Sequence, residues 1–229
     1  MPETANNKIL KDSIRAIIFD LDGVLIKNIP HHIVSWQYAF KKFGINATKK
    51  DLLLLEGMSY KETINFILKK YSKKLNTVDR EKIHLIKKEK VKTLLRVSPY
   101  PYVSMLLKLL KKRGLSLALV SGANKKFVQK IVDKFFKNFF KVIISGDDTN
   151  KNKPNPEPYL LAIKKLKFNA KEILVIENSP LGIKSAKKAG LTTYAIKTTL
   201  HKKFLLSADK IFFSHKKLLK EFQKSLTGP

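Results

Sequence analysis

The stretch that decides the fold is Ile14-Arg-Ala-Ile-Ile-Phe-Asp20-Leu-Asp22-Gly23-Val-Leu25. Its apolar start, rich in Ile and Phe, predicts a buried β-strand. Two carboxylates follow, and because an unpaired carboxylate is costly to bury, we expect Asp20 and Asp22 where the strand emerges from the sheet. Oxygen ligands at this spacing suit a hard cation such as Mg²⁺. Gly23 permits a backbone turn that a Cβ atom would hinder.

The same four residues, Asp20 to Gly23, are also compatible with a simple surface turn, because Asp and Gly are common turn residues. A calcium loop of the EF-hand type is disfavoured, since the further acidic positions and the closing Glu are missing downstream. The residues that follow the other strands must therefore decide between a turn and a site.

Composition favours a globular protein with a sizeable core. The chain has 229 residues, of which 44% are hydrophobic and 10% aromatic, and it has no cysteine. Disulfides and thiolate metal sites are therefore excluded, and we expect a cytoplasmic location. There is no apolar run of about 18 residues, and residues 1–11 lack the apolar stretch of a signal peptide. No membrane association is expected.

The net charge of +29 is the most unusual feature of the composition. Such a charge is typical of proteins that bind nucleic acid or anionic membranes. However, 43 of the basic residues are Lys and only four are Arg, the residue that usually reads bases and clamps phosphates. We interpret the scattered lysines as a solvated surface, with no specific nucleic-acid partner. Non-specific attraction to polyanions stays open as the alternative.

The periodicity of the chain divides it into two parts. Residues 29–97 show helical spacing without strand alternation, which predicts an inserted helical domain. Residues 1–28 and 98–229 alternate strands with helices, which predicts a doubly wound, Rossmann-like parallel α/β sheet. Residues 216–229 form a basic amphipathic tail. The helices expected in the insert are His32–Phe43, Asp51–Leu55, Ser59–Tyr71 and Val78–Leu95.

Polar groups follow every strand that the pattern places clearly. In a parallel sheet the carboxyl ends of the strands lie at one edge, where ligands bind. Four such groups together disfavour the surface-turn interpretation of Asp20 to Gly23. The predicted strand ends are followed by Asp20-x-Asp22, Ser121-Gly122, Gly146-Asp147 and Glu177-Asn178.

These motifs resemble those of the haloacid dehalogenase superfamily, in the branch of phosphoglycolate phosphatases, phosphosugar phosphatases and β-phosphoglucomutase. The resemblance covers nearly the whole chain, and the order and spacing of the motifs make it strong. The four matching stretches are Asp20-Leu-Asp-Gly-Val-Leu25, Val120-Ser-Gly122, Lys153-Pro-Asn-Pro-Glu-Pro-Tyr159 and Val175 to Gly190.

The resemblance implies a role for each core motif. Asp20 would be the nucleophile that forms an aspartyl-phosphate, and Asp22 would be the general acid and base. Ser121, which we also expect to cap a helix, and Gly122 would bind the transferring phosphoryl group. Lys153, aimed by the prolines that follow it, would neutralise the charges of nucleophile and phosphate.

The implied metal is Mg²⁺, held by Asp20, Asp22, Glu177 and Asn178. Many relatives carry two acids at the last two positions, so Asn178 is a departure that contributes an oxygen ligand without charge. A second departure is Lys27-Asn28, where relatives often carry Asp-Ser. The effect of Asn178 on metal affinity stays open.

The insert resembles the helical cap that closes over the phosphate and selects the leaving group. His32 and Trp36 match a His-x-x-x-Trp pattern at the cap entrance of several relatives, although Trp36 alone suits a core position better. We expect His32, Glu56 and Asn124 to contact the substrate.

The leading function is a Mg²⁺-dependent phosphatase for a small phosphorylated metabolite, such as a sugar phosphate or phosphoglycolate. A phosphomutase of the β-phosphoglucomutase kind uses the same core and is the alternative. Dehalogenation and phosphonate cleavage are disfavoured, because the first needs neither Asp22 nor Mg²⁺ and enzymes of the second kind generally lack the second Asp. A non-catalytic polyanion-binding protein is the alternative from another class. We expect a monomer.

Overall fold

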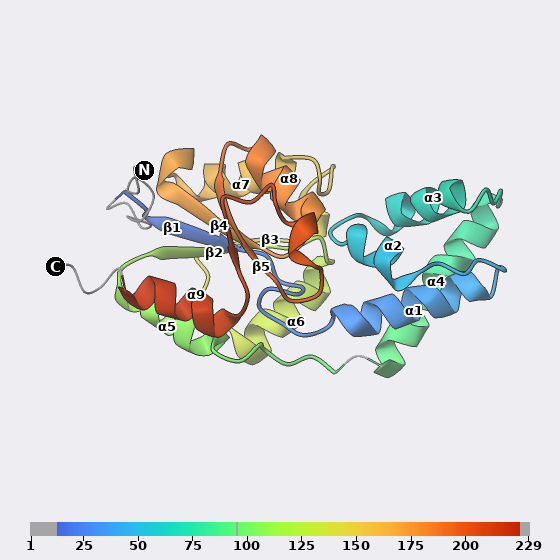
Figure 1. Ribbon diagram of the computed structural model, residues 1–229, viewed down its shortest axis with the longest axis horizontal. Coiled ribbons are helices and arrows are strands. Elements are labelled where there is room, and N and C mark those ends of the chain that lie inside the picture. Colours follow the sequence, from blue (N-terminus) through green and yellow to red (C-terminus); the bar gives the residue numbers. More distant parts are fainter. Residues whose placement is uncertain (1–12, 95, 225–229) are drawn as a thin grey trace, which may run out of the picture.

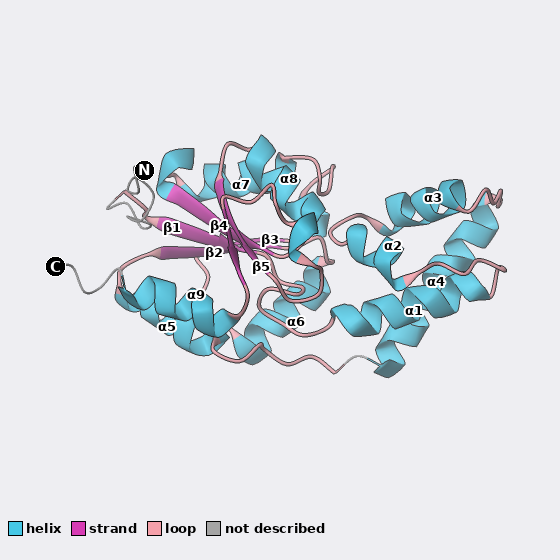
Figure 2. Ribbon diagram, viewed as in Figure 1, coloured by secondary structure: helices cyan, strands magenta, loops and turns pink. Residues whose placement is uncertain are grey.

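A six-stranded parallel sheet forms the centre of the molecule (Figures 1 and 2). The computed structural model describes residues 13–94 and 96–224. The strand order is β3-β2-β1-β4-β5-β6, and each neighbouring pair is parallel. The doubly wound α/β fold predicted from the sequence is therefore confirmed. The strands are β1 (Ala16–Phe19), β2 (Ser116–Val120), β3 (Val142–Ile144), β4 (Ile173–Glu177), β5 (Thr192–Ile196) and β6 (Lys210–Phe212).

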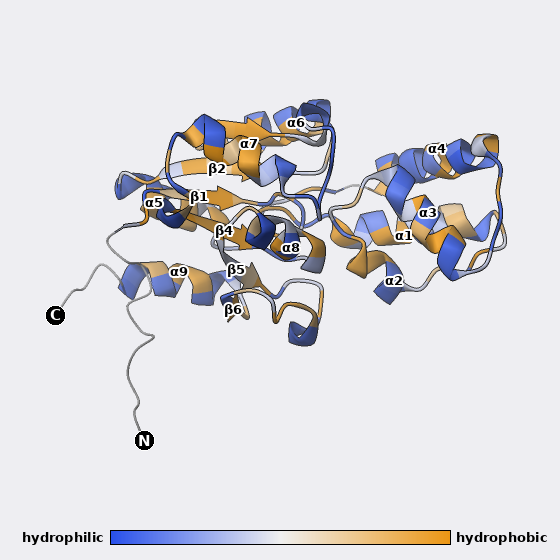
Figure 3. Cartoon of the chain, turned by 90° about the horizontal axis from the view of Figure 1, so that it is seen from above, coloured by the Kyte–Doolittle hydropathy of each residue, from blue (hydrophilic) through white to orange (hydrophobic). Residues whose placement is uncertain are grey.

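Strand β1 lies in the interior of the sheet and is fully buried. Its central residue Ile18 pairs with Ala118 of β2 on one side and with Val175 of β4 on the other. Helices pack on both faces of the sheet, so every side chain of β1 is buried, which is why β1 is a continuous hydrophobic run rather than an alternating one. The hydropathy colouring of Figure 3 shows this apolar centre. Every residue that follows β1 therefore leaves the sheet near its middle.

Helices cover both faces of the sheet. One face, with Ile17 and Phe19, packs against apolar residues of α5 (Val103–Lys112), α6 (Lys125–Phe135) and α9 (His215–Lys224). The opposite face, with Ala16 and Ile18, packs against α7 (Glu157–Leu166) and α8 (Pro180–Lys188). Within the described residues there are three short 3₁₀ helices, η1 (Gly146–Asp148), η2 (Ala170–Glu172) and η3 (Lys202–Phe204).

Four helices between β1 and α5 form a separate layer at one end of the molecule (Figure 1). They have a hydrophobic core of their own, which includes Trp36, Phe40 and Ile64. Leu200, from the loop after β5, joins that cluster, so the layer also rests on the sheet domain. The helices are α1 (Ile29–Lys41), α2 (Lys49–Leu54), α3 (Tyr60–Lys70) and α4 (Thr77–Leu94).

Most helices match their predicted ranges within a few residues. Helix α1 begins at Ile29, three residues before the expected start, because Pro30 fits the first turn of a helix, where no backbone donor is needed. The predicted tail at 216–229 lies largely within α9, whose Leu218 and Phe222 are buried against the sheet; its last residues, 225–229, lie outside the described part. Among the described helices, none is long and apolar enough to cross a membrane.

Candidate active site

Asp20 stands at the carboxyl end of β1, at the centre of the candidate site. Its backbone N–H donates to the carbonyl of Ile176 at 3.0 Å, which continues the ladder with β4. The residue is only 7% exposed, and its Oδ1 accepts a hydrogen bond from Lys153 Nζ at 2.6 Å. Burial, together with the charges of Glu177 and Asp22, raises the pKa of Asp20, while the Lys153 ammonium beside it opposes the rise and favours the carboxylate.

Lys153 is a buried cation that joins two carboxylates. Its Nζ donates to Asp20 Oδ1 at 2.6 Å and to Glu177 Oε1 at 2.7 Å, and the residue is 1% exposed. Burial disfavours the charged amine, but the two carboxylates outweigh it and raise the pKa of Lys153 well above its usual value. A buried charge is tolerated only when it is paired in this way. Lys153 therefore stays charged beside Asp20.

Glu177 ends β4 and is fully buried. Lys153 and the Tyr159 hydroxyl donate to its Oε1, while the backbone amides of Asn178 and Ser179 and the Ser179 hydroxyl donate to Oε2. Burial would raise the pKa of Glu177, but Lys153 and these hydrogen bonds hold it below its usual value. Glu177 is the counter-charge of Lys153 in this arrangement. Its metal-ligating role stays a prediction and requires these bonds to rearrange.

Asp22 lies two residues after Asp20, beside the second motif. Asn28 Nδ2 donates to its Oδ1 and the Ser121 hydroxyl lies 3.4 Å from its Oδ2. Burial raises the pKa of Asp22, and the hydrogen bond from Asn28 and the charge of Lys153 reduce the rise. A carboxyl group with a raised pKa can carry a proton nearer to neutral pH than an ordinary Asp can.

Ser121 follows β2 and is buried. We expected Ser121 to cap the next helix, and that expectation was wrong: α6 begins at Lys125, and its N-cap is Asn124, whose side chain accepts from the Phe127 amide at 2.9 Å. Gly122 and Ala123 separate Ser121 from the helix, so its Oγ instead accepts from the Ala123 amide at 3.1 Å. The side chain of Asn124 caps the helix through its Oδ1. The substrate contact expected of Asn124 stays a prediction.

Asn178 and Glu56 meet across the two layers. Asn178 Nδ2 donates to Glu56 Oε2 at 3.1 Å, and Glu56 belongs to the loop between α2 and α3. Burial and the charges of Asp20, Glu177 and Asp22 raise the pKa of Glu56 well above its usual value. A Cβ atom on Gly23 would lie 2.2 Å from Asn178 Nδ2, so only glycine admits the amide at this place.

A second link between the layers runs from Asp22 through Asn28 to His32 and Lys87. Asn28 Nδ2 lies 3.4 Å from His32 Nε2, and Lys87 Nζ lies 3.1 Å from His32 Nδ1. Burial, helped by the charge of Lys87, lowers the pKa of His32 to about 3. Burial likewise lowers the pKa of Lys87 to about 8. The expected cap position of His32 therefore brings it close to Asp22.

Lys87 and Asn28 were missed as site residues. On α4 the buried residues are Ile83 and Val91, and Lys87 lies midway between them, on the apolar stripe. A lysine at an inward helical position is the signal that could have found it.

Trp36 is 9% exposed and stacks on Phe40, as a core residue would, and Lys87 Nζ lies 5.2 Å from its ring centre.

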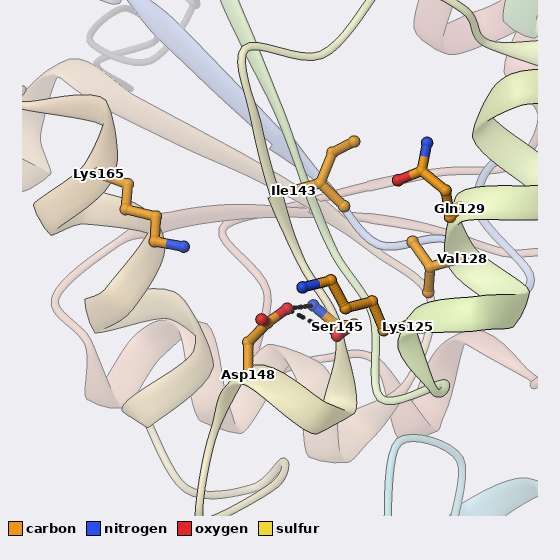
Figure 4. A pocket seen from close by; sticks show the side chains of 7 residues that line it. All are labelled: Lys125, Val128, Gln129, Ile143, Ser145, Asp148 and Lys165. Carbon is orange, nitrogen blue, oxygen red and sulfur yellow. Dashed lines mark hydrogen bonds between the residues drawn. The ribbon is translucent and has the colours of Figure 1, made fainter.

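The acids after β3 do not join this cluster of bonds. Asp147 accepts from the Lys125 amide at 2.8 Å, and Asp148 accepts from the amide and hydroxyl of Ser145 at 2.8 and 2.6 Å. They stabilise the local turn beside a pocket of about 190 Å³ between α6 and α7 (Figure 4). Its lining residues are Lys125, Val128, Gln129, Ile143, Ser145, Asp148 and Lys165.

The donor set at Asp20 fits a hard divalent cation. No described residue donates a hydrogen bond to Asn178 Oδ1, and only Lys153 of the described residues donates to Asp20 Oδ1, so both oxygens can still accept a cation. Among the described residues, no cluster of three or more acidic or imidazole groups is arranged to hold a metal by itself. A cation would therefore draw also on amide, backbone carbonyl and water oxygens, as Mg²⁺ commonly does.

The chain belongs to the haloacid dehalogenase-like hydrolases, whose family profile matches residues 17–196. It is 30% identical over 189 residues to the pyrophosphatase PpaX of Oceanobacillus iheyensis. The aligned part covers 82% of this chain and 86% of that protein. It is 28% identical to a phosphoglycolate phosphatase of Aquifex aeolicus, over 79% of this chain and 83% of that one.

Solved structures agree with this assignment. A protein of Bacteroides vulgatus that was assigned as a β-phosphoglucomutase has a TM-score of 0.84 and 30% identity, over 94% of this chain and 91% of the other. CbbY of Rhodobacter sphaeroides, solved in complex with phosphate, has a TM-score of 0.73 and 25% identity, over 92% of this chain and 99% of the other. The superfamily, branch and hydrolase class predicted from the motifs are confirmed.

Proposed function

We propose that this chain is a Mg²⁺-dependent phosphatase that hydrolyses a small phosphorylated metabolite through an aspartyl-phosphate on Asp20. The observation that carries the proposal is the convergence of Asp20, Lys153 and Ser121 at the carboxyl edge of the sheet, next to Asp22. A nucleophile, a fixed cation, a hydroxyl donor and an acid are the groups that phosphoryl transfer needs.

Asp20 is oriented for attack by its bond to Lys153. That bond occupies Oδ1 and leaves Oδ2 without a described donor. Oδ2 would therefore be the oxygen that attacks phosphorus, while the leaving oxygen departs on the opposite side. Lys153 would offset the negative charge of both the nucleophile and the phosphoryl group, because its ammonium is buried and held at 2.6 Å from Asp20. The Ser121 hydroxyl would bind a phosphoryl oxygen.

Asp22 would supply and then remove the proton. Its raised pKa favours the protonated carboxyl group that must protonate the leaving oxygen. Once the leaving group has gone, the same carboxylate would take a proton from the water that attacks the aspartyl-phosphate. Asn28 would keep Asp22 oriented through both steps.

Asp20, the backbone carbonyl of Asp22 and Asn178 would hold Mg²⁺. Glu177 would join them once its bonds to Lys153 and to the following amides rearrange. When bound, the cation supplies positive charge that neutralises the phosphoryl oxygens. This donor set has one formal carboxylate fewer than a site with two acids after β4. Lys153, which faces the same reacting groups, would add positive charge for the phosphoryl oxygens but would not replace the missing ligand charge.

The names of relatives support a small phosphorylated substrate. They include the phosphoglycolate phosphatase above and a phosphorylated carbohydrates phosphatase of Thermotoga maritima, which is 26% identical over 78% of this chain and 82% of its own length. The layer α1–α4, which we propose as a cap over residues 29–97, would choose among such substrates. A cytoplasmic, monomeric enzyme remains our expectation.

A phosphomutase is the second candidate, favoured by the likeness to the Bacteroides vulgatus protein. Such an enzyme would return the phosphoryl group from Asp20 to another hydroxyl of the sugar. The core residues serve both reactions, so the difference must lie in how the cap admits water or sugar to Asp22.

The test is a screen of phosphorylated metabolites with the full-length protein and Mg²⁺, scored for free phosphate and for isomerised sugar phosphate. Release of phosphate with at least one small phosphomonoester supports the phosphatase, and isomerisation without release supports the mutase. Absence of both, with tight retention on heparin, would contradict catalysis and favour polyanion binding.

A further inference from the structure

The cap loop Leu55–Ser59 reaches from the helical layer into the candidate site. A Cβ atom on Gly57 would lie 3.3 Å from the side chain of Lys153, and one on Gly122 would lie 3.3 Å from the Gly57 carbonyl. The loop therefore lies directly on the second and third motifs. Glu56, the residue before Gly57, is the acidic group that this loop brings to Asn178.

Glu56 is poorly satisfied at this place. Its Oε2 accepts from Asn178 Nδ2 at 3.1 Å, but its Oε1 is buried without a hydrogen-bond partner among the described residues. The loop also carries this acid toward the carboxylates of Asp20 and Asp22, which repel it. A buried oxygen without a donor costs about 1–3 kcal/mol. The placement is therefore unfavourable for folding, which indicates a functional role.

The Asn178 amide has two ends, and Glu56 decides which way they face. In the structure Glu56 Oε2 accepts from the nitrogen of the amide at 3.1 Å, so Glu56 holds that end of Asn178. The oxygen, Oδ1, then faces away from Glu56 and accepts from no described residue. Gly23 leaves room for the amide directly above the first motif. Without Glu56, both orientations of the amide would be open.

We propose that Glu56 is a positioning residue of the cation site: by holding the nitrogen of the Asn178 amide, it leaves the amide oxygen free for Mg²⁺ and makes the cap loop part of the site. This inference rests on the proposed function and deepens it. A chain with Asp at position 178 would need no such partner, because either carboxylate oxygen can serve a cation. The need for Glu56 thus arises because position 178 carries Asn instead of Asp. Cation binding and docking of the loop on the sheet domain would then favour each other.

The test is a double-mutant cycle on cation affinity, measured by isothermal titration of Mg²⁺ into the full-length protein without substrate. Glu56→Gln keeps the shape of the side chain but can pair with either end of the amide. We expect it to weaken Mg²⁺ binding at least about fivefold, or about 1 kcal/mol. In the Asn178→Asp background, Glu56→Gln should not weaken Mg²⁺ binding, because either oxygen of the Asp carboxylate can face the cation.

The matched control is Glu89→Gln, which removes the same charge from an exposed position on α4; it should leave the affinity unchanged. Equal losses on Glu56→Gln with Asn and with Asp at position 178 would overturn the proposal, since Glu56 would then act only through its charge. Unchanged affinity in Glu56→Gln would overturn it too, while leaving the phosphatase intact. If the wild-type chain binds no Mg²⁺ yet turns over substrate, this proposal fails together with the metal dependence. Should Glu56→Gln not fold, Glu56→Ala carries the same cycle.

Discussion

Replacing Lys87 by Met is predicted to stabilise the protein while impairing the site. Lys87 lies on the apolar stripe of α4 between Ile83 and Val91. Its pKa falls from 10.5 to about 8, mainly through burial. That difference corresponds to about 3 kcal/mol of unfavourable free energy for the charged amine in the folded state. Met keeps the apolar stem without the charge, so the penalty disappears.

The pH dependence of the gain follows from the sign of the shift. Because the folded-state pKa is lower than the unfolded one, the penalty is complete below about pH 8 and fades as the pH rises toward 10.5. Between about pH 7 and about pH 9.5 the penalty falls by about 2 kcal/mol. The advantage of Lys87→Met over the wild type should shrink by a similar amount over that interval.

Lost contacts reduce the gain but not its pH dependence. Met cannot pair with His32 Nδ1, 3.1 Å from the amine, nor interact with the Trp36 ring as a cation. These losses cost about 1 kcal/mol each, so the net gain at about pH 7 is about 1 kcal/mol. Turnover should fall roughly tenfold, because a cation near Asp22 is lost; this is the usual exchange of function for stability.

The assay is urea unfolding of both proteins at the two pH values, with Lys88→Met as the control. Lys88 is exposed on the same helix, so its replacement removes the same charge and should change the unfolding free energy by less than about 0.5 kcal/mol. A stability difference between Lys87→Met and wild type that is the same at both pH values would refute the argument, because the Lys87 ammonium would then not be desolvated by folding.

Three further predictions follow from the site and the charge. A chelator should abolish activity, Mg²⁺ should restore it and Ca²⁺ should restore it less, because its larger coordination shell misplaces the phosphate; full activity after chelation would contradict the role of Asp20 as a ligand. Raising ionic strength from about 0.05 M to about 0.5 M should lower kcat/KM several-fold for an anionic substrate, since salt screens the +29 charge, whereas an uncharged osmolyte should have no such effect. Gly182→Ala places a Cβ atom 1.7 Å from Glu177 Oε1, so it should destabilise the fold by more than about 2 kcal/mol and abolish turnover. Helix propensity alone predicts that the same change stabilises the fold by about 1 kcal/mol. A raised melting temperature of the variant would therefore contradict the clash with Glu177.

The fold was largely predictable because its signals are local. The apolar run before Asp20 and the similar runs before Ser121 and Glu177 mark buried strands, and the carboxyl-edge rule places the polar residues that follow them together. Asp20 and Lys153 are 133 positions apart, yet their contact at 2.6 Å matches the expectation of a shared site. The functional roles of these residues stay proposals.

The bonds inside the site were not predictable, because they depend on side-chain direction. The backbone amides that surround Glu177 follow it directly in the chain, but spacing does not show that they point back to its carboxylate. Lys87 is one of 43 lysines, and α4 has a weakly marked apolar face, so a single inward lysine did not stand out. A serine near a helix start predicts a cap, but spacing does not show that the turn continues through Gly122 and Ala123 and that Asn124 caps the helix.

The most direct measurement of the central claim is the capture of the phosphorylated enzyme. The full-length protein would be mixed with Mg²⁺ and its best substrate, quenched in acid within milliseconds and digested for mass spectrometry. We predict a phosphoryl group on Asp20, in a peptide that contains the first motif. We also predict its absence from a folded Asp20→Asn variant, with turnover below about a hundredth of the wild-type rate. A phosphoryl group on another residue, or an Asp20→Asn variant that keeps its turnover, would contradict the account.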